Sequence, residues 1–142
     1  MARLATVVLV VRDLERALAV YEEGLGFART GAVRDVPSAG ARQVVLRTEN
    51  CLVELIEPHD ETKPPGMFLR ARGEGVFGLE VGVEDVDEVR ERLDSAQVKV
   101  IGTPVDPAEA GGAAGRSRCF VGPRDAQGIL LEVVSAPAGG PA

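Results

Sequence analysis

Two short stretches, VLVVRDL at residues 8–14 and EVGVEDV at residues 80–86, decide how the rest of the sequence is interpreted. In each stretch an apolar run ends in a charged residue followed by Asp, and apolar residues at helical spacing come next. Asp13 and Asp85 are therefore predicted N-caps, and Glu88 stands at the capping-box distance from Asp85. This recurrence predicts two copies of one module, offset by 72 residues between the two aspartates.

The elements that follow each helix have the same order in both halves. Segment 58–74, which contains three prolines, is predicted to connect the halves. We therefore predict an α+β fold with two tandem β-α-β-β-β modules, at about residues 4–58 and 75–134. They would form one domain over residues 1–134, followed by a flexible tail at 135–142. The predicted strands after the helices lie at residues 27–34, 42–48 and 51–57, and at 98–104, 116–121 and 129–134.

Composition limits the classes of partner. The 142 residues carry a formal net charge of −6, which disfavours nucleic acid and anionic membranes as partners. The apolar run at residues 5–11 is too short to cross a bilayer and has no cleavage pattern behind it. Two cysteines, Cys51 and Cys119, do not make a disulfide framework. We expect a reduced, cytoplasmic protein that binds neither nucleic acid nor a membrane.

Two glutamates lie in the middle of predicted strands among apolar neighbours. Glu54 and Glu132 occupy matching positions in the final strand of each module, with an offset of 78 residues. A single such glutamate is well explained by a strand face in water, but the repetition favours a site. Burial raises the pKa of a carboxyl group, and a second carboxylate raises it further. Such a pair suits general acid–base chemistry or a metal site.

The paired β-α-β-β-β pattern resembles the vicinal oxygen chelate superfamily, which includes glyoxalase I, ring-cleaving dioxygenases, bleomycin-resistance proteins and methylmalonyl-CoA epimerase. The epimerase branch is the most similar. The resemblance implies a cupped mixed sheet around a central cavity, a divalent metal held by one residue from each of four strands, and a homodimer. It is carried by VRDLERALAVYEEGLGF at residues 11–27, VELIEP at 53–58, FLRARGEGVFGLEVGVEDVDEV at 68–89 and CFVGPRDAQGILLEVV at 119–134.

Of the four positions that hold metal ligands in the family, only two carry a ligand residue in this chain. Glu54 and Glu132 match carboxylate positions, whereas Thr6 and Gly78 stand where the family has histidines, and Phe77 replaces the histidine that often precedes the second one. Two carboxylates without imidazoles make a poor site for Co, Zn or Ni. We therefore predict no cofactor, and no metal at these four degenerate positions; a hard cation such as Mg would also lack ligands unless Glu80 moved in, which is the alternative.

Further residues are expected to line the cavity. Glu80, two residues after Gly78, shares that strand face, where the family has a small or apolar residue; a solvated edge position is the alternative. Gln43 matches a glutamate proposed as a base in some members. Arg118 follows a Gly-rich segment that borders the thioester-carrier pocket in the family, although it could equally be solvated. His59, the sole histidine, falls off the ligand positions and is predicted to lie in a surface loop.

Three functions remain open from the sequence. The first is a metal-independent isomerase, epimerase or cyclase, or a lyase, that acts on a carbonyl-containing small molecule; its predicted catalytic residues are Glu54, Glu132 and Glu80. The second is a non-catalytic protein that sequesters a small molecule, and the third is a metal-dependent methylmalonyl-CoA epimerase with a depleted site. The residues expected to bind the small molecule are Gln43, Thr6, Gly78 and Arg118.

Overall fold

The computed structural model describes residues 1–101 and 117–135, and these form two compact units. We call Thr6–Phe77 the N-unit, and Met1–Ala5 together with Gly78–Ala142 the C-unit. Each is described by itself. The Gly-rich loop, Arg116 and residues 136–142 of the predicted tail lie outside the described residues, while Ser135 is the last residue of a strand.

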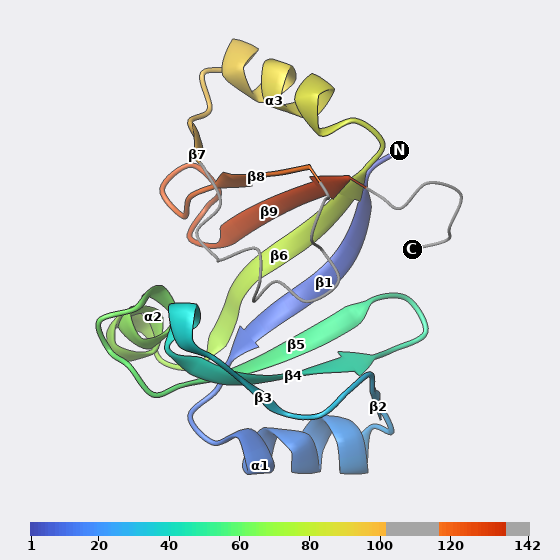
Figure 1. Ribbon diagram of the computed structural model, residues 1–142, viewed down its shortest axis with the longest axis vertical. Coiled ribbons are helices and arrows are strands. Elements are labelled where there is room, and N and C mark those ends of the chain that lie inside the picture. Colours follow the sequence, from blue (N-terminus) through green and yellow to red (C-terminus); the bar gives the residue numbers. More distant parts are fainter. Residues whose placement is uncertain (102–116, 136–142) are drawn as a thin grey trace. The chain divides into compact units, whose positions relative to one another are not determined.

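The first module forms the N-unit, except that the start of its first strand, before Thr6, belongs to the C-unit. Its strands have the order β2-β4-β5-β1, and β3 also pairs with β4. Strand β1 runs parallel to β5, whereas β4 runs antiparallel to β5 (Figure 1). The strands are β1 (Arg3–Val10), β2 (Ala28–Arg29), β3 (Arg34–Val36), β4 (Ala41–Arg47) and β5 (Leu52–Pro58). The helices are α1 (Leu14–Leu18), which continues as a π-helix (Ala19–Gly24), a 3-10 turn (Pro37–Ala39) and α2 (Pro64–Arg72).

The second module repeats this plan. Its strands have the order β6-β9-β8-β7, with β6 parallel to β9 and β8 antiparallel to both β9 and β7. The elements are β6 (Gly75–Val83), α3 (Val86–Ser95), β7 (Val100–Ile101), β8 (Arg118–Val121) and β9 (Leu130–Ser135). The predicted β-α-β-β-β order is therefore found in the second module, and in the first module it differs only in that β2 and β3 stand in place of one expected strand.

The strand register confirms the internal repeat. Val8 is the partner of Glu54 on the parallel strands β1 and β5, and Glu80 is the partner of Glu132 on β6 and β9. Glu80 lies 72 positions after Val8, and Glu132 lies 78 positions after Glu54. Both offsets are those that the internal repeat of the sequence predicts. The two modules thus bring equivalent positions together in the same way.

Each module helix begins at the predicted aspartate. Asp13 and Asp85 have extended backbones, and each side chain accepts a hydrogen bond from the backbone N–H three residues later, at 3.1 Å in both cases. These bonds satisfy N–H groups that the helix itself leaves without a partner. The helix that follows Asp13 ends at Gly24, and Gly26 turns the chain with a φ of 77°.

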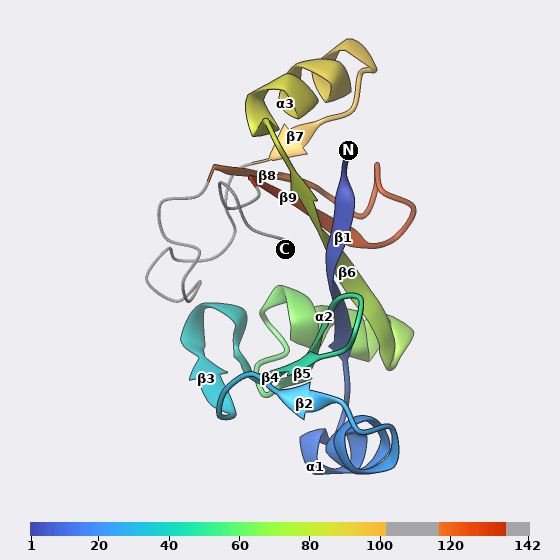
Figure 2. The same cartoon turned by 90° about the vertical axis from the view of Figure 1, so that its right-hand side faces the viewer.

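The core of each unit lies on the side of the sheet that its module helix covers. In the N-unit, Val53 and Leu55 of β5 pack with Leu14 and Leu18 of α1. Figure 2 shows α1 on this side of β2, β4 and β5. In the C-unit, Val133 of β9 packs with Val86 of α3. Because side chains alternate along a strand, Glu54 and Glu132 lie on the faces opposite α1 and α3.

Two segments differ from the sequence-based expectation. The predicted connector contains α2, which begins at Pro64; proline suits the first turn of a helix because no partner is needed there for its missing N–H. The single strand expected at residues 27–34 is two short strands, β2 and β3. Among the described residues, every helix falls short of the length and hydropathy needed to cross a membrane.

Candidate functional site

The C-unit places two carboxylates side by side on the face opposite α3. Glu80 of β6 and Glu132 of β9 are partners in the parallel register, on strands that lie about 4.8 Å apart in a sheet. Their neighbours Val81 and Val133 point the other way, into the core beneath α3. The prediction that Glu80 and Gly78 share a strand face is therefore confirmed.

An arginine joins this pair from the next strand. Arg118 of β8 lies with Nη1 3.0 Å from Oε1 of Glu132, and the two side chains are only 11% and 23% exposed. The backbone carbonyl of Arg118 accepts a hydrogen bond from Nη2 of Arg90, at 3.3 Å, which links α3 to the start of β8. The sequence left open whether Arg118 is solvated; its side chain is instead largely buried against Glu132.

Burial, and after it the negative charge of Glu80, raise the pKa of Glu132. The positive charge of Arg118 lowers it in part, and the net pKa is about 7. Desolvation and a like charge destabilise the ionised form of a carboxyl group, which explains the direction of the shift. A carboxyl group with a pKa near neutrality can both hold and release a proton at physiological pH.

The N-unit builds a different network on the matching face. Thr6, Gln43 and Glu54 lie on the side of the sheet opposite α1, and Thr6 and Gln43 are buried. The Gln43 amide orientation that satisfies its neighbours directs the nitrogen to Oε1 of Glu54. Its oxygen then accepts from Nε and Nη2 of Arg34 on β3, each at 2.7 Å. An amide therefore connects Glu54 to a guanidinium group, and the sequence analysis did not identify Arg34.

Gly78 sits where β6 and β9 approach each other closely. A Cβ atom at this position would lie 2.4 Å from the backbone carbonyl oxygen of Leu130, closer than real Cβ contacts come. The sequence shows only that a histidine is missing at residue 78. The structure adds that its space is filled by backbone, which cannot swing aside as a long side chain can.

These residues do not fit the divalent metal that the resemblance implies. Thr6 offers no imidazole, and position 78 has no room for a side chain that could carry one. Glu132 is paired with Arg118, and Glu54 accepts from Gln43. Metals such as Zn, Co and Ni favour imidazole ligands, and a cation beside Glu132 would also meet the positive charge of Arg118.

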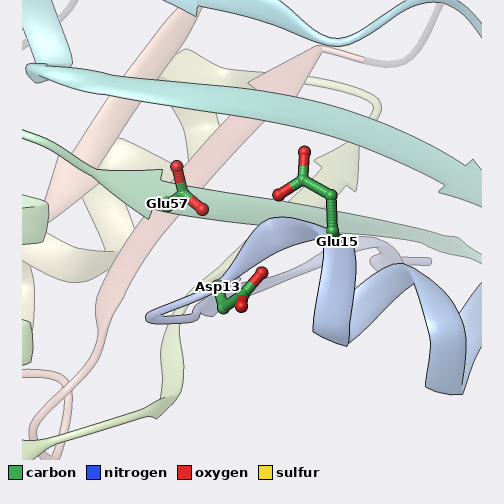
Figure 3. Close-up of side chains that lie close together, drawn as sticks. All are labelled: Asp13, Glu15 and Glu57. Carbon is green, nitrogen blue, oxygen red and sulfur yellow. The ribbon is translucent and has the colours of Figure 1, made fainter.

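A second group of carboxylates lies at the start of α1. Oxygen atoms of Asp13, Glu15 and Glu57 lie within 4.8 Å of one another (Figure 3). Oε2 of Glu57 accepts from the N–H of Leu14 at 2.7 Å, and Oε1 of Glu57 accepts from Nη2 of Arg42 at 2.9 Å. These bonds hold the helix terminus to β5, so the cluster has a structural explanation, and it was not found in the sequence analysis.

The histidine and the cysteines lie as the sequence predicts. His59 is exposed, just after β5, with Nε2 2.8 Å from Oδ1 of Asp35. Cys51 and Cys119 are free thiols, and Cys119 is buried in β8, where desolvation raises its pKa. These side chains therefore offer no nucleophile activated by a neighbouring base.

Comparison with known proteins defines the class. The family model for the Glyoxalase/Bleomycin resistance protein/Dioxygenase superfamily matches residues 3–133, so the chain belongs to this superfamily. Within it, the chain is 34% identical over 132 residues to the ethylmalonyl-CoA/methylmalonyl-CoA epimerase of Cereibacter sphaeroides, covering 92% of this chain and 96% of that relative. It is 30% identical over 144 residues to the mitochondrial methylmalonyl-CoA epimerase of Bos taurus, covering 96% and 75% of the two chains.

Solved structures lead to the same branch. The crystal structure of methylmalonyl-CoA epimerase from Mycobacterium tuberculosis matches with a TM-score of 0.77 and 30% identity, covering 95% of this chain and 89% of that chain. A variant of the Streptomyces coelicolor methylmalonyl-CoA epimerase, in complex with 2-nitronate-propionyl-CoA, matches with a TM-score of 0.74 and 26% identity, covering 96% and 98%. The predicted fold and its resemblance to the epimerase branch are therefore confirmed.

Proposed function

We propose that this protein is a metal-independent enzyme of the isomerase, epimerase, cyclase or lyase type, which moves a proton beside the carbonyl group of a small acyl compound. The observation that carries the proposal is the Glu80–Glu132 pair with Arg118 3.0 Å from Glu132. It stands on a chain that belongs to the glyoxalase superfamily and is similar to acyl-CoA epimerases. The relatives support the proposed substrate class, and the residues of the site support the proposed metal independence.

The carboxylates supply the proposed chemistry. In an epimerisation, a carboxylate takes the proton from the carbon next to the carbonyl, the C–H electron pair moves into the enolate, and a proton returns to the opposite face of that carbon. Glu132, whose pKa lies at about 7, can accept or donate that proton near neutral pH. Arg118 fixes the orientation of Glu132, and the charge of Glu80 keeps Glu132 basic.

The N-unit contains a further residue that we propose for acid–base chemistry. Glu54, which accepts from the Gln43 amide, is that residue. Gln43 and Thr6, both buried on the same face of the N-unit, are the proposed binding residues of that unit, and Gly78 and Arg118 are those of the C-unit. No step passes through a metal ion, because the residues present do not fit one.

The relatives suggest which substrate to test first. The Cereibacter sphaeroides relative is named for ethylmalonyl-CoA and methylmalonyl-CoA, and the Streptomyces coelicolor relative binds 2-nitronate-propionyl-CoA. A CoA thioester with an acidic C–H next to its carbonyl is therefore the proposed substrate class. We propose that the protein acts in the cytoplasm as a homodimer, which light scattering of the purified chain checks.

Deuterium exchange tests the function. The full chain is incubated with methylmalonyl-CoA in D₂O containing EDTA, and deuterium in the acyl group is followed by mass spectrometry. We expect exchange that EDTA does not slow and that Glu132→Gln slows on the order of 1,000-fold. Glu91→Gln, which changes an exposed glutamate of α3, is the matched control and should leave exchange unchanged.

Two outcomes would contradict the proposal. Loss of exchange in EDTA, with recovery on addition of Co²⁺, would identify a metal-dependent epimerase instead. Tight binding of the thioester, recovered without any deuterium, would identify a non-catalytic binding protein.

A further inference from the structure

We infer that Arg118 takes the place of a divalent cation beside Glu132 and Glu80, so that this face of the C-unit excludes a metal ion. The inference goes beyond the proposed function, because it concerns how two carboxylates are neutralised and holds whether or not the protein is an enzyme. It rests on the contacts of Glu132 and on the close approach of two strands at Gly78.

The first step concerns charge. Glu80 and Glu132 are direct partners on parallel strands, so their ionised carboxylates repel each other. Arg118, 11% exposed, lies 3.0 Å from Glu132 and supplies a positive charge where water screens it little. A metal ion that bound Oε1 of Glu132 would therefore sit next to a fixed guanidinium group, which is electrostatically unfavourable.

The second step concerns position. The start of β8 is fixed by pairing of Arg118 with Val134 on β9 and by the hydrogen bond from Arg90 to the Arg118 carbonyl. The backbone of Arg118 is therefore fixed by hydrogen bonds within a strand. A cation that displaced the guanidinium group would have to do so without a movement of this backbone.

The third step concerns access for a further ligand. At Gly78 a Cβ atom would lie 2.4 Å from the Leu130 oxygen and 3.3 Å from the Leu130 carbonyl carbon. Both are backbone atoms of a paired strand, so a side chain at residue 78 requires the strands to shift. This position therefore cannot supply a third ligand to Glu80 and Glu132 while β6 and β9 keep their register.

Replacement of the arginine tests the inference. In Arg118→Met the side chain keeps a similar length and loses its charge, so Glu132 loses the guanidinium group that lies 3.0 Å away. MnCl₂ is the probe, because carboxylates bind hard divalent cations, and affinity is measured by calorimetry and by the rise of Tm. We expect Arg118→Met to bind Mn²⁺ at least about ten-fold more tightly than the unchanged protein.

Two controls assign the gain to the carboxylates. Arg118→Lys keeps a positive charge and should bind Mn²⁺ as weakly as the unchanged protein. Arg118→Met combined with Glu132→Gln lacks one ligand and should lose the gain. Equal Mn²⁺ affinity in Arg118→Met and in the unchanged protein would overturn the inference.

Two more variants keep the inference testable if Arg118→Met does not fold. Adding Glu80→Gln removes one of the two repelling charges, so this double variant should fold; if it does not, Arg118 acts through packing and the inference is wrong. Gly78→Ala should lower Tm by several degrees, whereas Gly82→Ala on the same strand, where a Cβ would meet nothing closer than 3.4 Å, should stay near the original Tm. Equal Tm values would refute the steric step.

The outcomes separate this inference from the proposed function. Absence of exchange in D₂O together with a gain of Mn²⁺ affinity in Arg118→Met would overturn the function and support the inference. EDTA-resistant exchange, together with equal Mn²⁺ affinity in Arg118→Met and in the unchanged protein, would support the function and overturn the inference.

Discussion

The two modules place a glutamate at the same point of the same register and then surround it differently. In the N-unit, Glu54 faces Val8 across the parallel strands, and an amide links it to Arg34. In the C-unit, Glu132 faces Glu80 and pairs directly with Arg118. The repeat thus fixes where each glutamate stands, and the residues on adjacent strands determine the charges that surround it.

Removing each glutamate in turn gives the largest expected effect. We expect Glu132→Gln to slow exchange on methylmalonyl-CoA on the order of 1,000-fold, because the loss of a general acid–base group has this size. Glu54→Gln should slow exchange less, because we assign the main proton transfer to Glu132, whose pKa is raised to about 7. Circular dichroism checks that both variants fold, and a larger loss for Glu54→Gln would reverse the assignment of the two modules.

The second largest expected difference between the modules is in the pH dependence of stability. The pKa of Glu132 rises from 4.5 to about 7 on folding, so the folded protein holds a proton that the unfolded chain releases between these values. The free energy of unfolding is therefore highest below about pH 4.5 for this group, and falls as pH rises to about 7, by up to about 3 kcal/mol. Urea unfolding across this range measures the fall.

Glu132→Gln should remove this part of the pH dependence, and Glu54→Gln is the matched substitution in the other module. An unchanged slope in Glu132→Gln would show that Glu132 has an ordinary pKa in the folded protein.

Exchanging the residues that face the two glutamates sharpens the comparison further. Glu80→Val gives the C-unit the partner that the N-unit has, and should lower the pKa of Glu132 by up to about one unit, because a neighbouring negative charge is lost. Val8→Glu makes the reciprocal change and should raise the pKa of Glu54. Carbon-13 NMR titration of the glutamate carboxyl groups measures both shifts. Shifts of the two pKa values in the opposite directions would show that the facing residue does not control the pKa of either glutamate.

The helix caps give the smallest expected difference. Asp85→Ala should lower the free energy of unfolding by about 1 kcal/mol, the usual cost of losing an N-cap. Asp13→Ala should cost less, because Glu57 still accepts from the N–H of Leu14 at the same helix terminus. Urea unfolding of both variants, with Glu57→Gln combined with Asp13→Ala as the control, measures the difference. Equal costs for the two single variants would mean that Glu57 adds nothing.

Several features could be predicted from the sequence because they depend on local periodicity. The N-caps at Asp13 and Asp85 follow from residue type and spacing, and the common face of Glu80 and Gly78 follows from strand alternation. The helix α2 was missed because its paired prolines also suit a loop, and packing against β5 is not visible in a local pattern.

The amino-acid sequence by itself determined the duplicated module, its element order and the strand positions of Glu54, Glu80 and Glu132, since repetition and alternation are properties of a linear chain. Only the tertiary structure decided that Arg118 pairs with Glu132, that Gln43 joins Glu54 to Arg34, and that Gly78 leaves no room for a side chain. The physical reason is that charge compensation and steric exclusion act between strands that are distant in sequence. Their strength depends on separations of a few ångströms and on burial, which arise only when the sheet has formed.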